Sequence, residues 1–186
     1  MTSDDPIAFN TRDDENLARL IRARQSLAKY NRTGPEEGDV RHEILEELLS
    51  GVAPGLWIEP PFFCDFGDNI SFGAGCFINL NCVILDGAPV EIGAGTLLGP
   101  GVQIYATTHP MDPDERIYER GGVPSYNTTA EPVSIGEKVW IGGGAIIMPA
   151  VRIGDGSTIG AGSVVTKDMP DRVFAAGNPA RVIRDL

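Results

Sequence analysis

An aliphatic residue stands at every sixth position over the last third of the chain, and this column constrains the fold more than any other feature. Its members are Ile135, Ile141, Ile147, Ile153, Ile159 and Val165. A small or β-branched residue lies four places after each of the first five. Neither a helix nor an isolated strand explains a period of six. The pattern predicts repeats that stack on one another, because one such repeat cannot bury its apolar side alone.

The same column continues upstream with one interruption. It runs through Phe66, Phe72, Ile78 and Ile84, shifts by two residues at Asp86-Gly-Ala-Pro, and resumes as Ile92, Leu98 and Ile104. The three cysteines, Cys64, Cys76 and Cys82, fall at the small, inward position. With three hexads to a coil, Cys64 and Cys82 are expected to stack on one corner. Packing explains these thiols better than metal binding or catalysis does.

The repeat gives way to other patterns in three places. Helices are expected over residues 11–32, with Thr11 and Asp14 as a capping box, and from a cap at Asp39 to Gly51. We therefore divide the chain into an N-terminal helical segment, 1–56, and a repeat domain, 57–186. Residues 106–132, rich in Pro and charge, form an excursion loop, which is typical of a functional or disordered insertion. A C-terminal tail, 167–186, ends in a short strand over 181–184.

Charge and composition exclude several classes of partner. The net charge of −11 argues against nucleic acid and anionic membranes. No apolar run approaches the roughly 18 residues of a membrane span, and the acidic start is unlike a signal peptide. An odd number of cysteines favours a reducing cytoplasm. Only the tail leans positive, and Lys167, Arg172, Arg181 and Arg184 fit either a solvated terminus or contacts with a phosphorylated ligand.

Several stretches together resemble the maltose and galactoside O-acetyltransferases of the hexapeptide-repeat superfamily. They are the hexads, Asn79-Leu-Asn-Cys-Val-Ile-Leu-Asp86, Thr107-Thr-His-Pro-Met-Asp-Pro, Val139-Trp-Ile-Gly-Gly, Val164-Val-Thr-Lys-Asp and Gly177-Asn-Pro-Ala-Arg-Val-Ile. The resemblance implies a mainly β fold, a left-handed parallel β-helix of triangular section with a short N-terminal α-helical segment. It also implies a homotrimer in which acetyl-CoA and a sugar acceptor meet between subunits.

Two residues are the expected catalytic pair. Acyl transfer to a hydroxyl needs a base of near-neutral pKa, and imidazole suits that task. By residue type alone, His109 could equally be structural or merely exposed, but the family's catalytic histidine lies in the same Thr-His-Pro setting. Asn79 could simply cap a turn of the coil. In the family the matching Asn stabilises the transition state, and an amide donor suits the oxyanion that develops on a thioester carbonyl. No covalent acyl-enzyme is expected.

The resemblance also assigns binding residues. Those expected at the cofactor are Gly143, Ala161, Thr166, Lys167, Arg181 and Arg184, where the glycine and alanine offer backbone and the cations meet the CoA phosphates. Those expected at the acceptor are Asp13, Asp65, Phe77 and Asp86. The chain departs from galactoside enzymes here: Phe77 replaces a Tyr, Gly87 replaces an acceptor-binding Asp, and the arginine of the first helix aligns with Leu20.

Three other functions compete with sugar acetylation. A zinc-dependent hexapeptide hydratase needs three His ligands, and this chain has two His in all, so no metal is expected. An acetyltransferase that modifies antibiotics shares the fold and the histidine, but the N-terminal helical segment favours the sugar-acetylating branch. A non-catalytic scaffold predicts that loss of His109 changes no activity.

Overall fold

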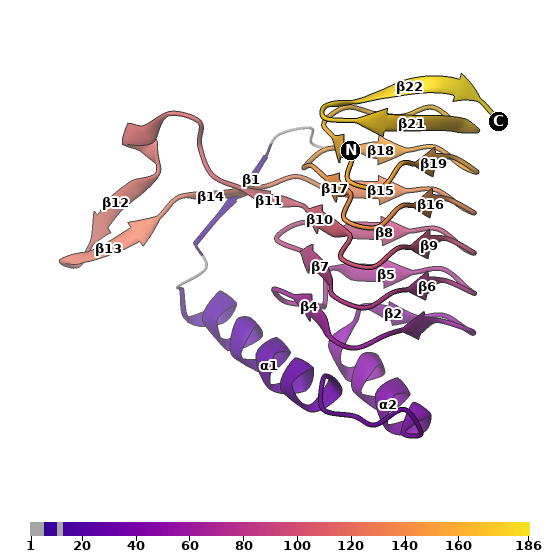
Figure 1. Ribbon diagram of the computed structural model, residues 1–186. Coiled ribbons are helices and arrows are strands. Elements are labelled where there is room, and N and C mark those ends of the chain that lie inside the picture. Colours follow the sequence, from indigo (N-terminus) through magenta and orange to yellow (C-terminus); the bar gives the residue numbers. More distant parts are fainter. Residues whose placement is uncertain (1–5, 11–12) are drawn as a thin grey trace.

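The coils of the hexapeptide repeat form a parallel β-helix with three sheets, and the expected fold class is confirmed (Figure 1). The structure is a computed structural model that describes residues 6–10 and 13–186.

We number the sheets in the order in which the chain visits them. The bounds of their strands, sheet by sheet, are as follows. Sheet 1 holds β2 (Gly51–Val52), β5 (Ile70–Phe72), β8 (Val90–Ile92), β15 (Val133–Ile135) and β18 (Arg152–Ile153). Sheet 2 holds β3 (Trp57–Ile58), β6 (Phe77–Ile78), β9 (Leu97–Leu98), β16 (Trp140–Ile141), β19 (Thr158–Ile159), β21 (Val173–Gly177) and β22 (Ala180–Asp185). Sheet 3 holds β4 (Phe62–Cys64), β7 (Cys82–Leu85), β10 (Gln103–Tyr105), β17 (Ile146–Ile147) and β20 (Val164–Val165).

The interior of the coils consists of three aliphatic ladders, one to each sheet. In the ladder of sheet 2, Ile58, Ile78, Leu98, Ile141 and Ile159 are paired strand to strand and all are buried. The column that the sequence predicts is therefore the inward face of the strands. Each such side chain contributes about 1.5–3 kcal/mol by leaving water. At the corners, glycine allows the coils to come this close: a Cβ on Gly142 would lie 2.5 Å from the backbone N of Ala161.

The predicted stacking of Cys64 on Cys82 is wrong. Cys82 pairs with Phe62, and Cys64 pairs with Ile84 in the aliphatic ladder of sheet 3. The lower coils advance by twenty residues between paired positions, as between Ile58 and Ile78, whereas the upper coils advance by eighteen. The two additional residues of the first coil lie in the loop 65–69, so Phe66 is an insertion and not a column residue. All three cysteines are nevertheless buried and unpaired.

Insertions accumulate at one corner of the helix, between sheet 3 and sheet 1, which we call the 3–1 corner. The first coil carries the loop 65–69 there, the second carries Asp86-Gly-Ala-Pro, and the third carries the whole excursion from residue 106 to 132. The corner between sheet 2 and sheet 3, the 2–3 corner, is regular. The coils begin at β2, before the boundary expected at residue 57.

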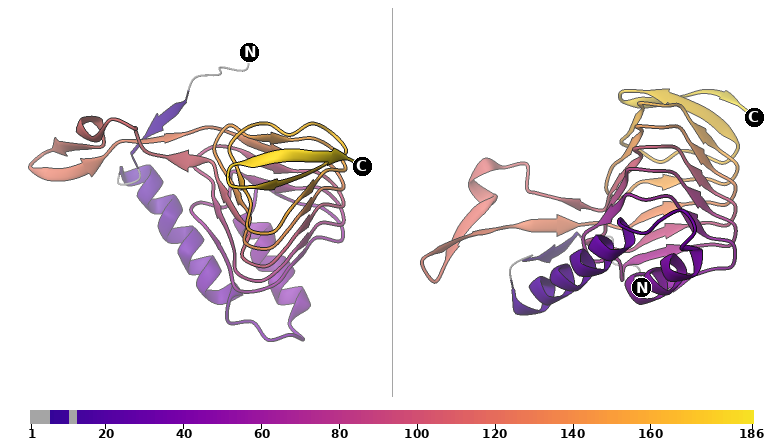
Figure 2. Two further views of the ribbon diagram at one scale, coloured as in Figure 1. Left: turned by 45° about the horizontal axis from the view of Figure 1, so that its top comes forward. Right: turned by 60° about the horizontal axis from the view of Figure 1, so that its bottom comes forward.

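The excursion contains regular secondary structure. It contains β11 (Thr107–Thr108), η1 (Pro113–Glu115), β12 (Ile117–Arg120), β13 (Val123–Tyr126) and β14 (Thr128–Ala130). Strands β12 and β13 form an antiparallel hairpin that projects from the coils in every view (Figures 1 and 2). Gly121 and Gly122 turn it with φ of 58° and 79°, the left-handed conformation that a two-residue hairpin turn demands. Strand β1 (Ile7–Phe9) pairs with β14 and so ties the N-terminal segment to the excursion.

Two helices lie beside the lower coils (Figure 2). Helix α1 spans Asp14–Tyr30, and its N-cap is Asp13, whose side chain accepts from the Asn16 N–H. Thr11 of the expected capping box lies outside the described residues. Helix α2 spans Gly38–Leu48 and follows Glu37, which makes no side-chain cap. The expected cap Asp39 therefore sits in the first turn. The expected terminal strand is β22, paired with β21.

Candidate active site

His109 follows β11 at the 3–1 corner, where the excursion leaves the coils. Its side chain is exposed, and its Nδ1 lies 2.8 Å from the carbonyl oxygen of Asn127. Asn127 is fixed in turn, because its own N–H donates to the Arg116 carbonyl at 2.9 Å. A carbonyl oxygen can only accept, so we assign the proton of neutral imidazole to Nδ1. This leaves the lone pair of Nε2 free to accept a proton, as a general base requires.

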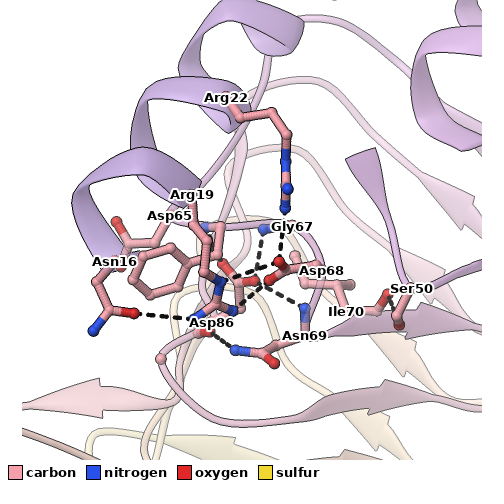
Figure 3. Close-up of polar contacts among 12 residues, drawn as sticks. Asn16, Arg19, Arg22, Ser50, Asp65, Gly67, Asp68, Asn69, Ile70 and Asp86 are labelled. Atoms are coloured by element: carbon pink, nitrogen blue, oxygen red, sulfur yellow. Dashed lines mark hydrogen bonds and ion pairs between the residues drawn. The ribbon is translucent and has the colours of Figure 1, made fainter. Parts of the chain in front are cut away.

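Asp86 stabilises the backbone of the loop 65–69 beneath that corner (Figure 3). Its side chain is fully buried, and its carboxylate accepts from the N–H groups of Asp65, Phe66 and Gly67 at 2.7–3.0 Å and of Asn69 at 3.4 Å. Burial raises the pKa of Asp86, and these N–H donors oppose the rise. The expected contact between Asp86 and an acceptor does not fit this geometry, because the carboxylate is enclosed. In the described chain Asp86 has a structural role.

Two arginines of α1 bind the same loop through Asp68, an arrangement that the sequence did not predict (Figure 3). Arg19 Nε donates to Asp68 at 3.1 Å and Arg22 at 2.8 Å. Burial alone would raise the pKa of Asp68, but the two guanidinium groups outweigh it and lower the pKa. The Arg19 guanidinium also lies 4.3 Å from the ring centre of Phe66. Arg19 and Arg22 are the neighbours of Leu20, where the family arginine was expected, and they fasten α1 to the coils.

Two of the predicted acceptor residues lie near this corner. Asp13 caps α1, and its second carboxylate oxygen accepts from Asn16 Nδ2 at 3.1 Å. Asp65 lines a pocket of about 380 Å³ between α1 and the lower edge of sheet 3, together with Arg24, Asn31, Cys64 and others. Burial, reinforced by the charge of Asp86, raises the pKa of Asp65 to about 6. Asp65 therefore loses its proton at a higher pH than an exposed aspartic acid does.

The second catalytic candidate lies elsewhere, at the 2–3 corner. Asn79 follows β6, and its Oδ1 accepts from the Leu80 N–H at 2.8 Å. This contact orients the amide, whose NH₂ group is the donor of the side chain and can bond to a ligand. Phe77, the half-buried predicted acceptor residue, precedes it on the outer face of sheet 2. In the upper coils of the same corner lie Gly143 and Ala161, where the Gly162 N–H donates to the Gly143 carbonyl.

The predicted cofactor cations are dispersed. Arg181 is paired with Ala176 near the end of β21, close to the 2–3 corner with Ala161. Arg184 lies further along β22, with its guanidinium 5.9 Å from the ring centre of Phe174. Thr166 and Lys167 follow β20 and are exposed at the 3–1 corner. Within residues 6–10 and 13–186, Lys167, Arg181 and Arg184 form no ion pair, and Arg181 Nη1 donates to the Ala180 carbonyl at 2.8 Å.

The site residues are thus divided between two corners of one chain. His109, Asp13, Asp65 and Lys167 belong to the 3–1 corner, whereas Asn79, Gly143, Ala161 and Arg181 belong to the 2–3 corner. The strands of sheet 3 separate the two groups. The predicted site residues therefore form two groups, and a single chain does not bring these groups together.

Two classes of site can be tested directly in residues 6–10 and 13–186. Within these ranges no three His, Cys, Asp or Glu side chains are grouped so that they could hold a metal ion. No helix in the same part of the chain is long and apolar enough to cross a membrane.

Comparison with known proteins decides the family. Residues 132–167 match the model of the bacterial transferase hexapeptide (six repeats), and residues 8–53 match the maltose acetyltransferase hexapeptide capping motif. The chain is 49% identical to nodulation protein L of Rhizobium meliloti, over 94% of this chain and 91% of that protein. It is 39% identical to the galactoside O-acetyltransferase of Escherichia coli, over 90% and 79% respectively. The chain belongs to the maltose and galactoside O-acetyltransferase family.

Solved structures agree with this membership. A maltose O-acetyltransferase from Clostridium difficile superposes with a TM-score of 0.88 at 38% identity, covering 97% of this chain and 93% of that one. A hexapeptide-repeat acetyltransferase from Vibrio cholerae, in complex with acetyl coenzyme A, superposes with a TM-score of 0.86 at 34% identity, covering 96% and 92%. Acetyl transfer is therefore the reaction class of this O-acetyltransferase family member.

Proposed function

We propose that this acetyltransferase moves the acetyl group of acetyl-CoA to a hydroxyl of a sugar by direct transfer, with His109 as the general base. The observation that carries the proposal is the hydrogen bond between His109 Nδ1 and the Asn127 carbonyl, because it orients the ring and leaves Nε2 as the proton acceptor. The names of the relatives support a carbohydrate acceptor and, in the Vibrio structure, the acetyl donor.

The chemistry needs two groups of this chain. As the acceptor oxygen attacks the thioester carbonyl, its proton passes to His109 Nε2, and the carbonyl oxygen becomes an oxyanion. The amide NH₂ of Asn79 donates to that oxyanion, and the contact between its Oδ1 and the Leu80 N–H orients the amide. When the intermediate collapses, the C–S bond breaks, and the imidazolium returns the proton to the CoA sulfur. The three cysteines are buried, and burial raises the pKa of each thiol, so none is suited to act as a nucleophile.

A homotrimer would reunite the two corners, and the outer faces of the sheets support one. Sheet 2 presents a ladder of Trp57, Phe77, Leu97 and Trp140, in which the two tryptophans and Leu97 are about half exposed. Sheet 3 presents Phe63, Val83, Gln103, Ile146 and Val164, of which four are apolar, whereas sheet 1 presents Ser71, Glu91, Ser134 and Arg152. Apolar ladders on two sheets that share the 2–3 corner are surfaces to be covered by neighbouring copies. A copy packed there would bring its own His109 toward Asn79.

Ligand contacts follow from that arrangement. Gly143 and Ala161 offer backbone groups to the pantetheine arm along the 2–3 corner, with Arg181 at its upper end. Thr166, Lys167 and Arg184 are proposed to contact the phosphates of CoA. Asp13, Asp65 and Phe77 are proposed to contact the acceptor, while Asp86 contributes indirectly by holding the loop that carries Asp65. We also place the protein in the cytoplasm, because its free thiols suit a reducing compartment.

A thiol-release assay tests the function. Purified protein is mixed with acetyl-CoA and a panel of mono- and disaccharides, with chloramphenicol as a representative antibiotic, and CoA release is followed with a thiol reagent. We expect acceptor-dependent turnover with at least one sugar and an O-acetylated product by mass spectrometry. Turnover with the antibiotic alone would favour a xenobiotic acetyltransferase, and no turnover with any hydroxyl acceptor would favour a non-catalytic scaffold.

A further inference from the structure

A second pocket lies between the start of α1 and the β12–β13 hairpin, on the side of the molecule that carries His109. It has a volume of about 640 Å³, within the range of small-molecule sites. Its described lining comes from three segments: Asn10, then Asp13, Asp14 and Leu17 of the helix start, and Arg120, Val123 and Ser125 of the hairpin.

Ser125 is the observation that points to a ligand. Ser125 is only 6% exposed, yet its hydroxyl makes no hydrogen bond within the described residues. No polar side-chain atom that is fully enclosed in those residues lacks a partner. The Ser125 hydroxyl must therefore retain some accessible surface, and the pocket that it lines is where that surface lies. A hydroxyl that is nearly buried and has no protein partner can bond only to water or to a polar group of a ligand in this pocket.

The walls of the pocket are held in place before any ligand arrives. Asn10 Nδ2 donates to the Tyr118 hydroxyl at 3.0 Å, which links the segment before α1 to the hairpin. Strand β1 pairs with β14, so the same segment is also joined to the base of the excursion. Val123 and Ser125 alternate with Pro124 along β13 and so share the face that lines the pocket.

The pocket is also close to the proposed base. Ser125 is two residues from Asn127, whose carbonyl binds His109, so the two backbone positions are about 7 Å apart along an extended chain. A group in the pocket therefore lies near, and not at, the reacting hydroxyl. A bound acceptor could place one ring beside His109 and a further part of the molecule against Ser125.

The charges in the pocket select the chemistry of that further part. Arg120 makes no ion pair in the described chain, and it lines the same pocket as Asp13 and Asp14. A carboxylate or phosphate on the ligand would meet two like charges, and an ammonium group would meet Arg120. A neutral polyhydroxylated group suits both the carboxylates and the guanidinium. Its hydroxyls can donate to the carboxylates and accept from Arg120 and Ser125.

We propose that the α1–hairpin pocket is an acceptor subsite that binds a second, neutral sugar unit next to the one that is acetylated, with Arg120 and Ser125 as its specificity-determining residues. The proposal rests on the proposed sugar acetylation. It predicts that the enzyme prefers a disaccharide to the corresponding methyl monosaccharide.

The test compares kcat/KM for maltose and methyl α-glucoside, or for another such pair that the acceptor panel identifies. We expect Arg120→Gln to lower kcat/KM for the disaccharide about 10-fold, as for loss of a hydrogen bond to a charged group, and Ser125→Ala about 3- to 10-fold. The value for the monosaccharide should stay within about 2-fold. The matched control is Glu119→Gln, the exposed neighbour of Arg120 whose side chain is not in the pocket; both values should be unchanged.

The outcomes distinguish a failure of the proposed subsite from a failure of the proposed sugar acetylation. If the wild type acetylates both sugars with equal kcat/KM, or if Arg120→Gln and Ser125→Ala reduce both substrates equally, the subsite is refuted while sugar acetylation stands. If neither sugar is acetylated by any variant or by the wild type, sugar acetylation itself fails. Circular dichroism melting of both variants within a few degrees of wild type excludes unfolding as the cause of a loss.

Discussion

His109 and Asn127, eighteen residues apart, are joined across the base of the excursion by a 2.8 Å contact between Nδ1 and a backbone carbonyl. The excursion thus closes on itself beside the coils and fixes the orientation of one imidazole. The other histidine, His42, lies exposed on α2 with its Nε2 3.3 Å from Glu46. His109 and His42 therefore form a matched pair for mutation.

Replacement of His109 should remove turnover and not structure. We expect His109→Ala to lower kcat at least ~100-fold, because a positioned general base typically contributes that factor or more. His42→Ala should leave kcat unchanged. Steady-state CoA release measures both, and analytical ultracentrifugation checks that the assembly is intact. Equal activity in the two variants would contradict the assignment of the base.

Asn79→Asp is a sharp test of the oxyanion role. The carboxylate can still accept from the Leu80 N–H, as Oδ1 does now, but it no longer donates. We expect kcat to fall about 100-fold, in line with the loss of about 3 kcal/mol when one oxyanion donor is removed. The control is Asn81→Gly, since Asn81 has φ of 61° and Gly retains that conformation. If Asn79→Asp is as active as Asn81→Gly, Asn79 stabilises the turn but not the oxyanion.

Removal of tail cations should weaken donor binding selectively. For Lys167→Ala combined with Arg181→Ala, we expect KM for acetyl-CoA to rise about 10-fold or more, since hydrogen bonds to charged groups are worth about 1.5–3 kcal/mol each. The KM for the acceptor should change less. Lys29→Ala with Arg32→Ala removes the same charge from exposed positions in and after α1. A similar rise in that control would indicate a general effect of charge and not a CoA site.

Asp65 should make stability depend on pH. Its pKa is about 6 in the folded chain and about 4 when unfolded, so the folded state binds more protons between these values. Its contribution to stability is therefore present below about pH 4 and lost as pH rises through 6. We expect the free energy of unfolding of Asp65→Asn, measured by urea titration, to increase relative to that of wild type as the pH rises from 5 to 7.5. A difference that is constant over this range would mean that Asp65 does not titrate there.

A charge on an apolar ladder should dissociate the proposed trimer. Trp140 on sheet 2 is 55% exposed, and the equivalent outward position on sheet 1 is Ser134. We expect Trp140→Glu to give monomers at micromolar concentration and to abolish turnover, because burying an unpaired charge is costly. Ser134→Glu should remain trimeric and active. Light scattering after size exclusion measures both; a wild-type monomer with full activity would remove the need for a second copy.

The six-residue column was sufficient to predict the coils. Ile141, Ile147 and Ile153 are recognisable in sequence because each hexad must place one aliphatic residue inward, whatever the rest of the chain does. The hairpin also has a local signal in the sequence: Gly121-Gly122 follows Ile117-Tyr118 and precedes Val123 closely, and a Gly pair favours the turn of a two-residue hairpin.

Only the tertiary structure decided what was inserted where. Phe66 fits the hexad by count, yet Cys64 takes the column position, because the loop 65–69 adds residues whose N–H groups are satisfied by Asp86. The sequence predicts that Asp86 contacts the sugar acceptor, but its side chain is buried in the structure. Likewise His109 and Asn79 are both legible as catalytic residue types, but their separation by sheet 3 depends on the path of the coils. Local periodicity fixes which side chains point inward, whereas the meeting of distant side chains depends on every turn between them.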